Sequence, residues 1–332
     1  MYLDLPKPFM ILAPMDDVTD SVFRRVVIKA QAPDLCFTEF VNVDGLQSPG
    51  RQKLLKKLYF TPEEQPLIAQ VWGKDPDNFY KTSKEIVGGT IAKEMGLPRG
   101  VNFAGVDLNM GCPQKTEVSS GTCAALMNDR PLAHEIIEAT KKGLGGELLL
   151  SVKTRIGFNT VDLSWIEFLL KHQLSMLTLH GRTRKEKSAV LADWEVIGEA
   201  RKLRDKISPD TLIVGNGDVR DKQHGLELAA RYNLDGIMIG RGIFSDLYAF
   251  ADNSPWQELE FEKRIELFKT HVELFASTWQ NNERPIHTLN KFCKIYISNF
   301  EGAKELREKF MSAKSAQELI KIIDFALEGQ IA

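Results

Sequence analysis

The sequence is poor in cysteine and has no long apolar run. Cysteine occurs at four positions, Cys36, Cys112, Cys123 and Cys293, and no two of them form a CxxC pair. This spacing argues against a disulfide framework and against a zinc site. No apolar run approaches the roughly 20 residues of a membrane span, and the first residues lack the charged and apolar regions of a secretory signal. We therefore expect a soluble cytoplasmic protein with no bound metal and no membrane partner.

The sequence also lacks an excess of charge of either sign. Its 43 Lys and Arg residues nearly balance 45 Asp and Glu residues, which leaves a formal net charge of −2. A strongly basic composition would indicate a nucleic-acid partner, and this composition does not. Any surface that binds nucleic acid must therefore come from local placement of basic side chains.

Short apolar runs that end in polar or glycine residues recur along the chain, with helix-length segments between them. They span residues 9–15, 35–39, 67–73, 106–112, 149–155, 176–182, 212–218 and 236–242. Eight such runs predict an α/β fold, the (β/α)8 or TIM barrel, in which the carboxyl ends of the strands surround the active site. The strand-end residues expected at that mouth are Gln70, Cys112, Lys153, His180, Asn216 and Arg241.

The last part of the chain has a different pattern. From Trp256 onward, apolar residues recur at spacings of three and four, which is typical of amphipathic helices. We therefore predict a barrel over residues 1–252 and a small, all-helical carboxyl-terminal domain over residues 253–332.

The segment from Asp107 to Lys115 contains the residue with the most specific chemistry. Gly111 permits close backbone approach and Pro113 stops the strand, so Cys112 is expected at a strand tip. A free cysteine is most often a small buried hydrophobe, and position alone favours that interpretation. Polar neighbours at the same mouth favour a second one, in which the thiol transfers a proton.

Glycine turns follow the last two predicted strands, at Gly215-Asn-Gly-Asp218 and Gly240-Arg-Gly242. In this fold, backbone N–H groups at these two positions commonly hold a phosphate. The alternative is that the glycines only make tight turns. Two such turns on adjacent strands, with Arg241 as a charged donor, favour a phosphorylated ligand.

Three other strand ends have side chains that suit a heterocyclic ligand. Lys153, beside Arg155, is costly to bury unless it meets an anion, such as the negative charge of a reduced flavin. His180 could donate to a ring carbonyl or a phosphate, or could simply order its loop. The amide of Gln70 offers a donor and an acceptor for a ring edge, although it could equally be an ordinary polar strand end.

Taken together, these motifs resemble the dihydrouridine synthase family of flavin-dependent RNA-modifying enzymes over almost the whole chain. The segments that carry the resemblance are Leu12-Ala-Pro-Met-Asp-Asp-Val-Thr-Asp20, Thr38-Glu-Phe40, Gln70-Val-Trp-Gly73, Asn109-Met-Gly-Cys-Pro113, Val152-Lys-Thr-Arg-Ile-Gly157, Leu179-His-Gly-Arg-Thr-Arg184, Ala192-Asp-Trp194, Gly215-Asn-Gly-Asp218 and Ile239-Gly-Arg-Gly242. Several are weak alone, but their order and positions together make the assignment highly specific.

The resemblance implies FMN as the bound cofactor and NADPH as a transient reductant. It implies Pro14, Met15 and Asp16 near the flavin ring, and Gln70, Lys153 and His180 at the ring or ribityl chain. Asn216, Gly217, Asp218, Gly240 and Arg241 are implied at the phosphate. The implied reaction reduces the C5–C6 double bond of uridine in tRNA: hydride goes from the flavin to C6, and Cys112 supplies the proton at C5.

The resemblance also implies that the helical domain grips tRNA, through residues 285–296 and 300–307. Candidate RNA contacts are Asn109, Lys115, Arg155, Arg182, Arg184, Arg284, Lys291 and Lys294, and the last two share a helix face. A solvated helix face is the simpler account of each basic residue. We expect the protein to act as a monomer.

Two segments depart from the family pattern. Residues 185–191 lack the usual Gln, Tyr and Gly, and Cys123 stands where a glycine-rich loop is common. Cys123 could lie near Cys112 or be a packed thiol. Three alternatives stay open: the same reaction on ribosomal RNA, a dihydroorotate dehydrogenase-like FMN enzyme acting on a free pyrimidine, and an RNA-binding barrel without redox function.

Overall fold

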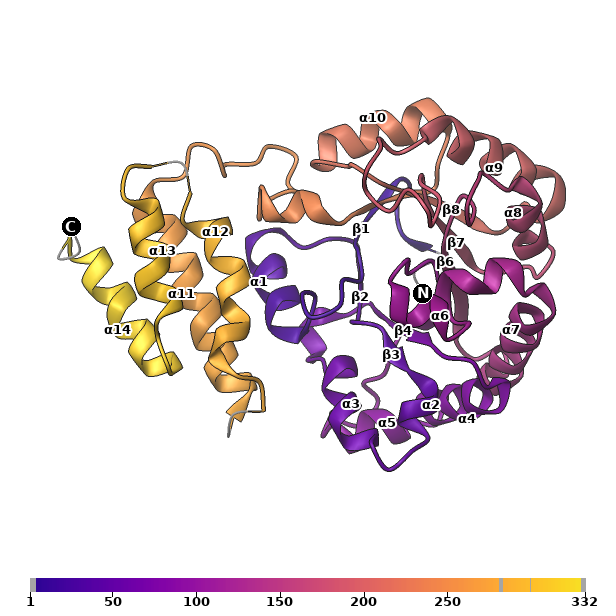
Figure 1. The fold of residues 1–332 in the computed structure, drawn as a ribbon, viewed down its shortest axis with the longest axis horizontal. Helices are drawn as coiled ribbons and strands as arrows, with labels where there is room; N and C mark the ends of the chain where they lie inside the picture. The colour runs from indigo at the N-terminus through magenta and orange to yellow at the C-terminus, as the bar shows by residue number, and fades with distance from the viewer. Residues whose placement is uncertain (1–3, 281–282, 299, 330–332) are drawn as a thin grey trace. The chain divides into compact units, whose positions relative to one another are not determined.

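The computed structural model describes residues 4–280, 283–298 and 300–329. The chain divides into two compact units (Figure 1). The first consists of Met1–Ser21 and Pro33–Arg241, and the second of Val22–Ala32 and Gly242–Ala332.

The first unit is a closed parallel barrel, as the sequence predicts. Its strands are β1 (Phe9–Leu12), β2 (Leu35–Phe37), β4 (Leu67–Trp72), β5 (Gly105–Met110), β6 (Leu149–Arg155), β7 (Met176–His180), β8 (Leu212–Asn216) and β9 (Gly236–Ile239), with β3 (Val41–Asn42) as a short addition beside β4. Each of the eight predicted runs overlaps one of the eight longer strands, and only β5 begins outside its run, by one residue. Pairing of β2 with β4, from Cys36 beside Leu67, closes the ring.

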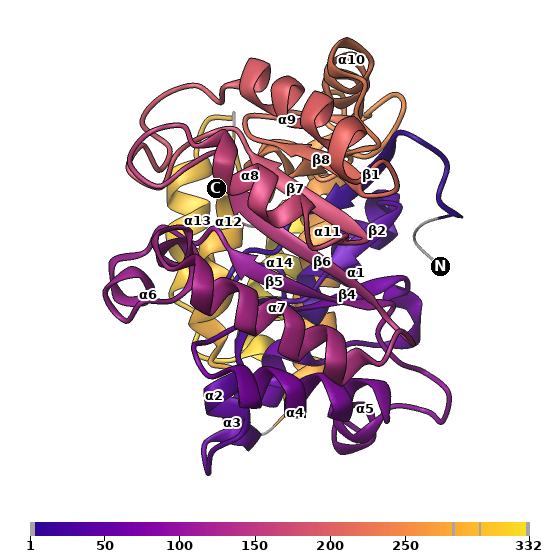
Figure 2. The same ribbon diagram turned by 90° about the vertical axis from the view of Figure 1, so that its right-hand side faces the viewer.

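Helices surround the strands on the outer side of this unit (Figure 2). They are α4 (Pro76–Val87), α5 (Thr90–Glu94), α7 (Arg130–Leu144), α8 (Leu163–Leu170), α9 (Trp194–Ile207) and α10 (Lys222–Tyr232), and shorter helices lie in the loops, α2 (Val43–Leu46), α3 (Arg51–Leu58) and α6 (Lys115–Ser119). Aspartate caps many of them: Asp129 accepts a hydrogen bond from the amide of Leu132 at α7, and Asp162 accepts from Trp165 at α8. Such caps satisfy N–H groups that have no partner within the helix.

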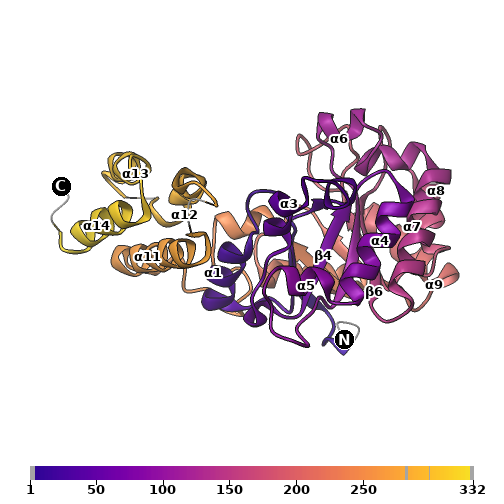
Figure 3. The same cartoon turned by 90° about the horizontal axis from the view of Figure 1, so that it is seen from below.

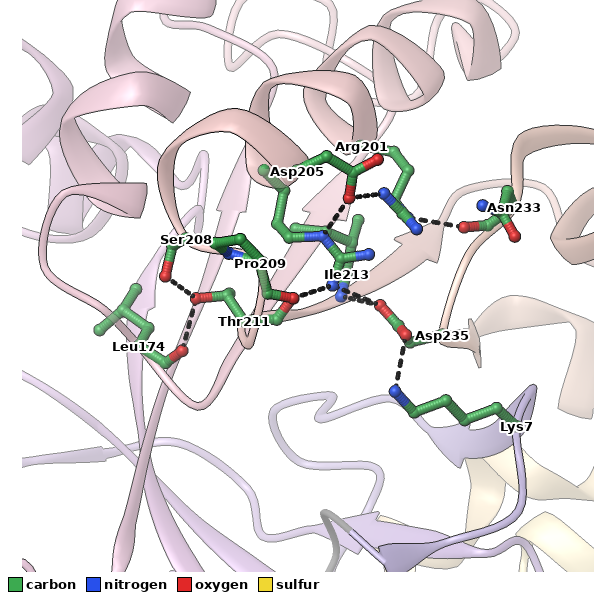
Figure 4. Close-up of polar contacts among 11 residues, drawn as sticks. Lys7, Leu174, Arg201, Asp205, Ser208, Pro209, Thr211, Ile213, Asn233 and Asp235 are labelled. Atoms are coloured by element: carbon green, nitrogen blue, oxygen red, sulfur yellow. Dashed lines mark hydrogen bonds and ion pairs between the residues drawn. The ribbon is translucent and has the colours of Figure 1, made fainter.

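The amino-terminal ends of four strands are joined by a polar network around Asp235 (Figure 4). Its carboxylate accepts hydrogen bonds from the Arg204 guanidinium at 3.2 Å, the Ile213 amide at 2.8 Å and the Lys7 ammonium at 2.9 Å. The hydroxyl of Thr211 donates to the carbonyl of Leu174 at 2.7 Å. Since Lys7, Leu174, Thr211 and Asp235 precede β1, β7, β8 and β9, the network stabilises the barrel end opposite the mouth.

The second unit is helical (Figure 3). It contains α1 (Ser21–Gln31) from its second residue onward, α11 (Phe261–Thr278), α12 (Cys293–Tyr296), α13 (Ala303–Met311) and α14 (Ala316–Leu327), with 3-10 turns η4 (Arg241–Phe244), from Gly242, and η6 (Ile286–Phe292). Within its core, Phe268 lies 4.9 Å from the ring of Tyr296 and 5.6 Å from that of Phe310.

The predicted boundary between residues 252 and 253 falls inside this second unit. Residues 242–252 belong to it, and so does most of α1, which follows the first barrel strand in sequence. The Phe23 ring of α1 stacks on Phe292 at 4.8 Å and on Phe244 at 6.3 Å. Aromatic packing therefore assigns α1 to the helical unit. Among the described residues, no helix is long and apolar enough to cross a membrane.

Candidate functional site at the carboxyl ends of the strands

The deepest polar layer of the barrel lies across β4, β5 and β6. Gln70, Asp107 and Ser151 are partners in register on these adjacent strands. The carboxylate of Asp107 accepts hydrogen bonds from the Ser151 hydroxyl at 2.6 Å and the Gln70 amide at 2.8 Å. All three side chains are fully buried. Burial raises the pKa of Asp107 to about 6, although these two hydrogen bonds and the charge of Lys153 oppose the shift.

Asn109 links this layer to the loop that carries Cys112. Its amide nitrogen donates to the Gln70 oxygen at 3.2 Å. Its oxygen accepts from the backbone amides of Gly111 at 3.1 Å and Cys112 at 3.0 Å. A Cβ at Gly111 would lie 3.1 Å from the Cα of Thr154, so the absent side chain permits the close backbone approach that the sequence predicts. Asn109 thus positions Cys112 through the backbone.

The thiol of Cys112 is partly buried and meets a second thiol. A hydrogen bond from Cys123 lowers the pKa of Cys112, although burial opposes the shift. The same hydrogen bond and burial raise the pKa of Cys123 well above its ordinary value. Cys123 is fully buried and adopts a positive φ of 53°. Cys112 is therefore the thiol of the pair that loses its proton more readily, and Cys123 is the one that keeps it.

Two positive side chains, Lys153 and Arg155, lie at the carboxyl end of β6. Lys153 is in register with Asn109 on one side and Thr178 on the other. Burial lowers the pKa of Lys153 to about 8 and that of Arg155 to about 10. Arg155 donates to the carbonyls of Gly111 at 2.9 Å and Thr183 at 3.2 Å, and so ties the Cys112 loop to the loop after β7.

Two buried polar atoms of β7 lie at this site without a hydrogen-bond partner among the described residues. They are the hydroxyl of Thr178 and Nδ1 of His180. Burial and the positive charges of Arg155 and Lys153 lower the pKa of His180 well below its ordinary value, so the ring is neutral at pH 7. Buried polar groups are almost always satisfied. These atoms therefore suit a polar ligand at the mouth.

The glycine turns after β8 and β9 form the next part of the site. Gly217 has a φ of +127°, and a Cβ there would lie 2.6 Å from the Cβ of Ala192. A Cβ at Gly240 would meet only Ala13, at an ordinary 3.6 Å, so the protein itself leaves room there. This open backbone suits the approach of an anion to N–H groups.

Asp218, in the first of these turns, holds two arginines. Arg182 donates to its carboxylate at 2.7 Å through Nη2, and Arg241 does so at 3.3 Å. Burial disfavours the charged carboxylate, but the hydrogen bonds from Arg182 and the Ala192 amide lower the pKa of Asp218 overall. Arg182 is only 2% exposed, whereas the side chain of Arg241 is 63% exposed. The exposed part of the Arg241 guanidinium can therefore also meet an anion, whereas Arg182 is enclosed.

The whole barrel mouth and the helical unit match one known family of proteins. The model of the family described as "Dihydrouridine synthase (Dus)" matches residues 11–330. The chain belongs to the dihydrouridine synthase family.

Relatives within the dihydrouridine synthase family are similar over nearly their full length. The "Probable tRNA-dihydrouridine synthase 2" of Bacillus subtilis (strain 168) is 42% identical over 324 residues, which cover 97% of this chain and 94% of the relative. The "Probable tRNA-dihydrouridine synthase" of Staphylococcus aureus (strain COL) is 41% identical with the same coverage.

Solved structures share the fold at low sequence identity. A complex of 2-naphthoyl-CoA reductase with 2-naphthoyl-CoA has a TM-score of 0.53 and 13% identity, covering 75% of this chain and 51% of that one. Histamine dehydrogenase from Rhizobium sp. 4-9 has a TM-score of 0.50 and 11% identity, covering 97% of this chain and 62% of that one. The chain thus spans about half to three fifths of these two proteins, and the likeness concerns the barrel fold alone.

The remaining residues that the dihydrouridine synthase resemblance implies lie as follows. Pro14, Met15 and Asp16 follow β1, and the amide of Met15 donates to the Thr19 hydroxyl at 2.9 Å. Asp16 is exposed and pairs with Lys57. Asn216 is buried at the end of β8 and donates to the Met238 carbonyl at 2.8 Å. Each therefore lies at a carboxyl strand end.

The candidate RNA contacts fall into three groups. Lys115, Lys291 and Lys294 are exposed. Arg184 stacks over Phe158 at 4.5 Å, and Arg284 is buried and stacks over Trp279 at 4.9 Å. Asn109, Arg155 and Arg182 bind the protein's own backbone or carboxylates, as described above. Three of the eight are therefore exposed lysines at the surface.

Sequence reasoning missed Asp107, Ser151 and Thr178 as site residues. The signal was alternation with a period of two, since Asp107 precedes Asn109 and Ser151 precedes Lys153 on their strands. Side chains two apart point to the same face, so both pairs point into the barrel.

Proposed function

We propose that this chain reduces the C5–C6 double bond of specific uridines in tRNA to give 5,6-dihydrouridine, with FMN as bound cofactor and NADPH as reductant. The observation that carries the proposal is the half-buried Cys112 thiol, held by Asn109 at the barrel mouth beside Lys153. The named relatives, called tRNA-dihydrouridine synthases, support the choice of tRNA.

The residues at the mouth fit FMN. The unsatisfied Thr178 hydroxyl and His180 Nδ1 suit the polar edge of a flavin or its ribityl chain. Lys153 would stabilise the negative charge of a reduced flavin bound at this mouth. Asn216, Gly217 and Gly240 would supply the phosphate site, with Arg241 as its charged donor. Asp218 would act indirectly, because its carboxylate orients Arg241 and cannot itself bind a phosphate.

When bound, FMN that NADPH has reduced would supply the hydride for C6 of the uridine. Cys112 would give its proton to C5, leaving a thiolate. The hydrogen bond from Cys123 stabilises that thiolate and lowers the pKa of Cys112. A donor whose pKa lies nearer the working pH is the more effective acid.

The helical unit would hold the tRNA. Lys291 and Lys294 line a groove of about 500 Å³ together with Trp256 and Phe244. The two exposed lysines suit a phosphate backbone, and the partly exposed ring of Phe244 suits a stacked base, whereas Trp256 is buried. Arg155 and Arg182 would instead position the loops, because both are bound within the barrel. We propose that the enzyme acts as a monomer in the cytoplasm, where its tRNA and NADPH are found.

Two measurements test the proposal: the FMN bound to the purified protein and the dihydrouridine present in cellular RNA. Purified protein should show flavin absorption and release FMN on denaturation, and Arg241→Ala should retain less FMN on dilution. Nucleoside mass spectrometry of tRNA and ribosomal RNA, from cells with and without the protein, should show a dihydrouridine position lost in tRNA. Loss of dihydrouridine from ribosomal RNA alone would make ribosomal RNA the substrate in place of tRNA. Loss from neither RNA would favour a free pyrimidine as substrate or a role without redox chemistry.

Cys112→Ala separates the two half-reactions. It should leave FMN binding and NADPH oxidation intact and slow single-turnover reduction of uridine by roughly two orders of magnitude or more. An unchanged single-turnover rate would remove the thiol from the mechanism.

A further inference from the structure

We propose that His134, Glu138 and His172 form a binding site for a divalent transition-metal ion, with zinc as the best fit, on the outer surface of the barrel. His134 and Glu138 lie on α7, one turn apart, and His172 follows α8. One ligand atom from each residue lies within 4.8 Å of the others. The sequence predicted no metal from the spacing of the cysteines alone, which does not test a site built from histidine and glutamate.

His172 has the hydrogen bonding of a metal ligand. Its Nδ1 lies 2.9 Å from the carbonyl of Phe168, which can only accept, so Nδ1 carries the proton. The lone pair of the neutral ring is therefore on Nε2, the atom that points to His134. A backbone carbonyl that fixes the tautomer in this way is a common partner of metal-bound histidine.

The two imidazoles already lie at nearly the separation that a shared ion needs. His134 Nδ1 lies 2.9 Å from His172 Nε2. Two nitrogen ligands of a tetrahedral zinc ion, each about 2.0–2.1 Å from the metal, are about 3.3 Å apart. A shift of a few tenths of an ångström suffices. Without metal, His134 donates its Nδ1 proton to His172. Metal binding replaces that hydrogen bond and moves the proton of His134 to Nε2.

Glu138 supplies the third ligand and a negative charge. Its Oε1 pairs with Lys141 at 3.0 Å, and its side chain is 48% exposed, so Oε2 can turn toward the imidazoles. Lys141 partly neutralises the carboxylate, which weakens the site without blocking it. His134 is exposed, so water can reach the fourth position. Two imidazoles and one carboxylate favour zinc over calcium or magnesium, which prefer oxygen ligands.

The position of the site indicates a structural role. α7 and α8 are successive outer helices of the barrel (Figures 1 and 2), and a shared ion would link them. The residues of the proposed redox site lie at the carboxyl strand ends instead. We therefore expect the metal to raise thermal stability by mass action and to leave uridine reduction unchanged.

The test is a titration of the metal-stripped full-length protein with Co²⁺ and Zn²⁺. Wild-type protein should bind one equivalent of Co²⁺ with the visible spectrum of a four-coordinate nitrogen and oxygen site, and Zn²⁺ should displace it. His134→Ala should bind Zn²⁺ at least about tenfold more weakly and lose the Zn²⁺-dependent rise in melting temperature. His134 is exposed, so this variant should fold.

Glu135→Gln is the matched control, because Glu135 is exposed on the same helix and outside the cluster. It should bind Zn²⁺ like wild type, whereas Glu138→Gln should bind more weakly. Equal affinity in wild type and His134→Ala would overturn the proposal and move the ion to the Cys112–Cys123 pair or to Asp16, Asp17 and Glu39. The absence of saturable binding to the wild type would overturn it as well.

Discussion

The buried thiol of Cys123 hydrogen-bonds to the thiol of Cys112. The backbone supports the contact, because the amide of Ala124 donates to the carbonyl of Cys112 at 3.4 Å. Cys123 has to adopt a left-handed backbone conformation to reach this position, which costs about 1 kcal/mol or more for a residue with a side chain. The contact gives Cys112 a donor that stabilises its thiolate.

Removing that donor should change the pH dependence of the reaction. The proposed proton donor acts while Cys112 is protonated, so activity falls as pH rises through its pKa. Cys123→Ala removes the hydrogen bond that lowers the pKa of Cys112, and the falling limb should move to higher pH. The rate of Cys112 alkylation by iodoacetamide, measured against pH by peptide mass spectrometry, should shift in the same direction. Cys123→Ser retains a donor and should shift less. Identical profiles for wild type and Cys123→Ala would show that the thiols are not coupled.

Asp107 should make the protein less stable as pH rises from about 4 to about 6. Its pKa is about 6 in the fold against an ordinary 3.8. Over this range the unfolded chain has lost the proton that the folded chain retains. The folded state therefore loses about 3 kcal/mol relative to the unfolded state.

Asp107→Asn removes this titration, so the free energy of unfolding of the variant should change less between about pH 4 and about pH 6 than that of wild type. Urea unfolding across that pH range measures this free energy. The stability of the variant relative to wild type should increase with pH. Glu167→Gln, at a site whose side chain is 44% exposed, is the control and should follow wild type. Parallel curves for Asp107→Asn and wild type would mean that the carboxyl titrates normally.

Asp235 should be essential to the stability of the barrel. Asp235→Ala removes the buried one of the two carboxylates that pair with Arg204, at 3.2 Å, and leaves only the exposed Asp205 at 3.0 Å; it also removes the acceptor of the Ile213 amide. Loss of one partner of a buried ion pair costs about 3–5 kcal/mol. Lys7→Ala removes an ion pair whose lysine is 47% exposed, and should cost under about 1 kcal/mol. Urea unfolding of both variants tests the difference, and similar losses would contradict it.

Lys291 and Lys294 should contribute to tRNA affinity in a salt-dependent way. The double variant Lys291→Ala/Lys294→Ala should weaken tRNA binding and reduce the slope of log affinity against log salt by about one to two, because each phosphate contact releases counterions. Filter binding at several salt concentrations measures both quantities, and NADPH oxidation should not change. Lys304→Ala, an exposed lysine of α13, is the matched control. An unchanged slope in the double variant would exclude these lysines from the RNA surface.

Much of the fold and the position of the site followed from local sequence pattern. An apolar run that ends in Gly, Cys or His identifies a barrel strand and its mouth end, because parallel strands share their carboxyl ends. For this reason Gln70, Lys153 and His180 could be assigned to one mouth before any distance was known. The glycine turns could be placed on β8 and β9 for the same reason.

The succession of apolar runs in the sequence therefore determined the barrel fold and the mouth at which the polar residues gather. Tertiary structure alone decided which of these side chains are held by other residues and which are exposed. Arg182 and Arg241 are both arginines near a loop in sequence, yet Asp218 and burial hold Arg182 while Arg241 stays exposed. The contacts of Cys112 with Cys123, of α1 with the helical unit, and of His134 with His172 are likewise tertiary. A sequence pattern shows which face of an element is buried, but strand register, rotamers and packing between distant segments select its partner.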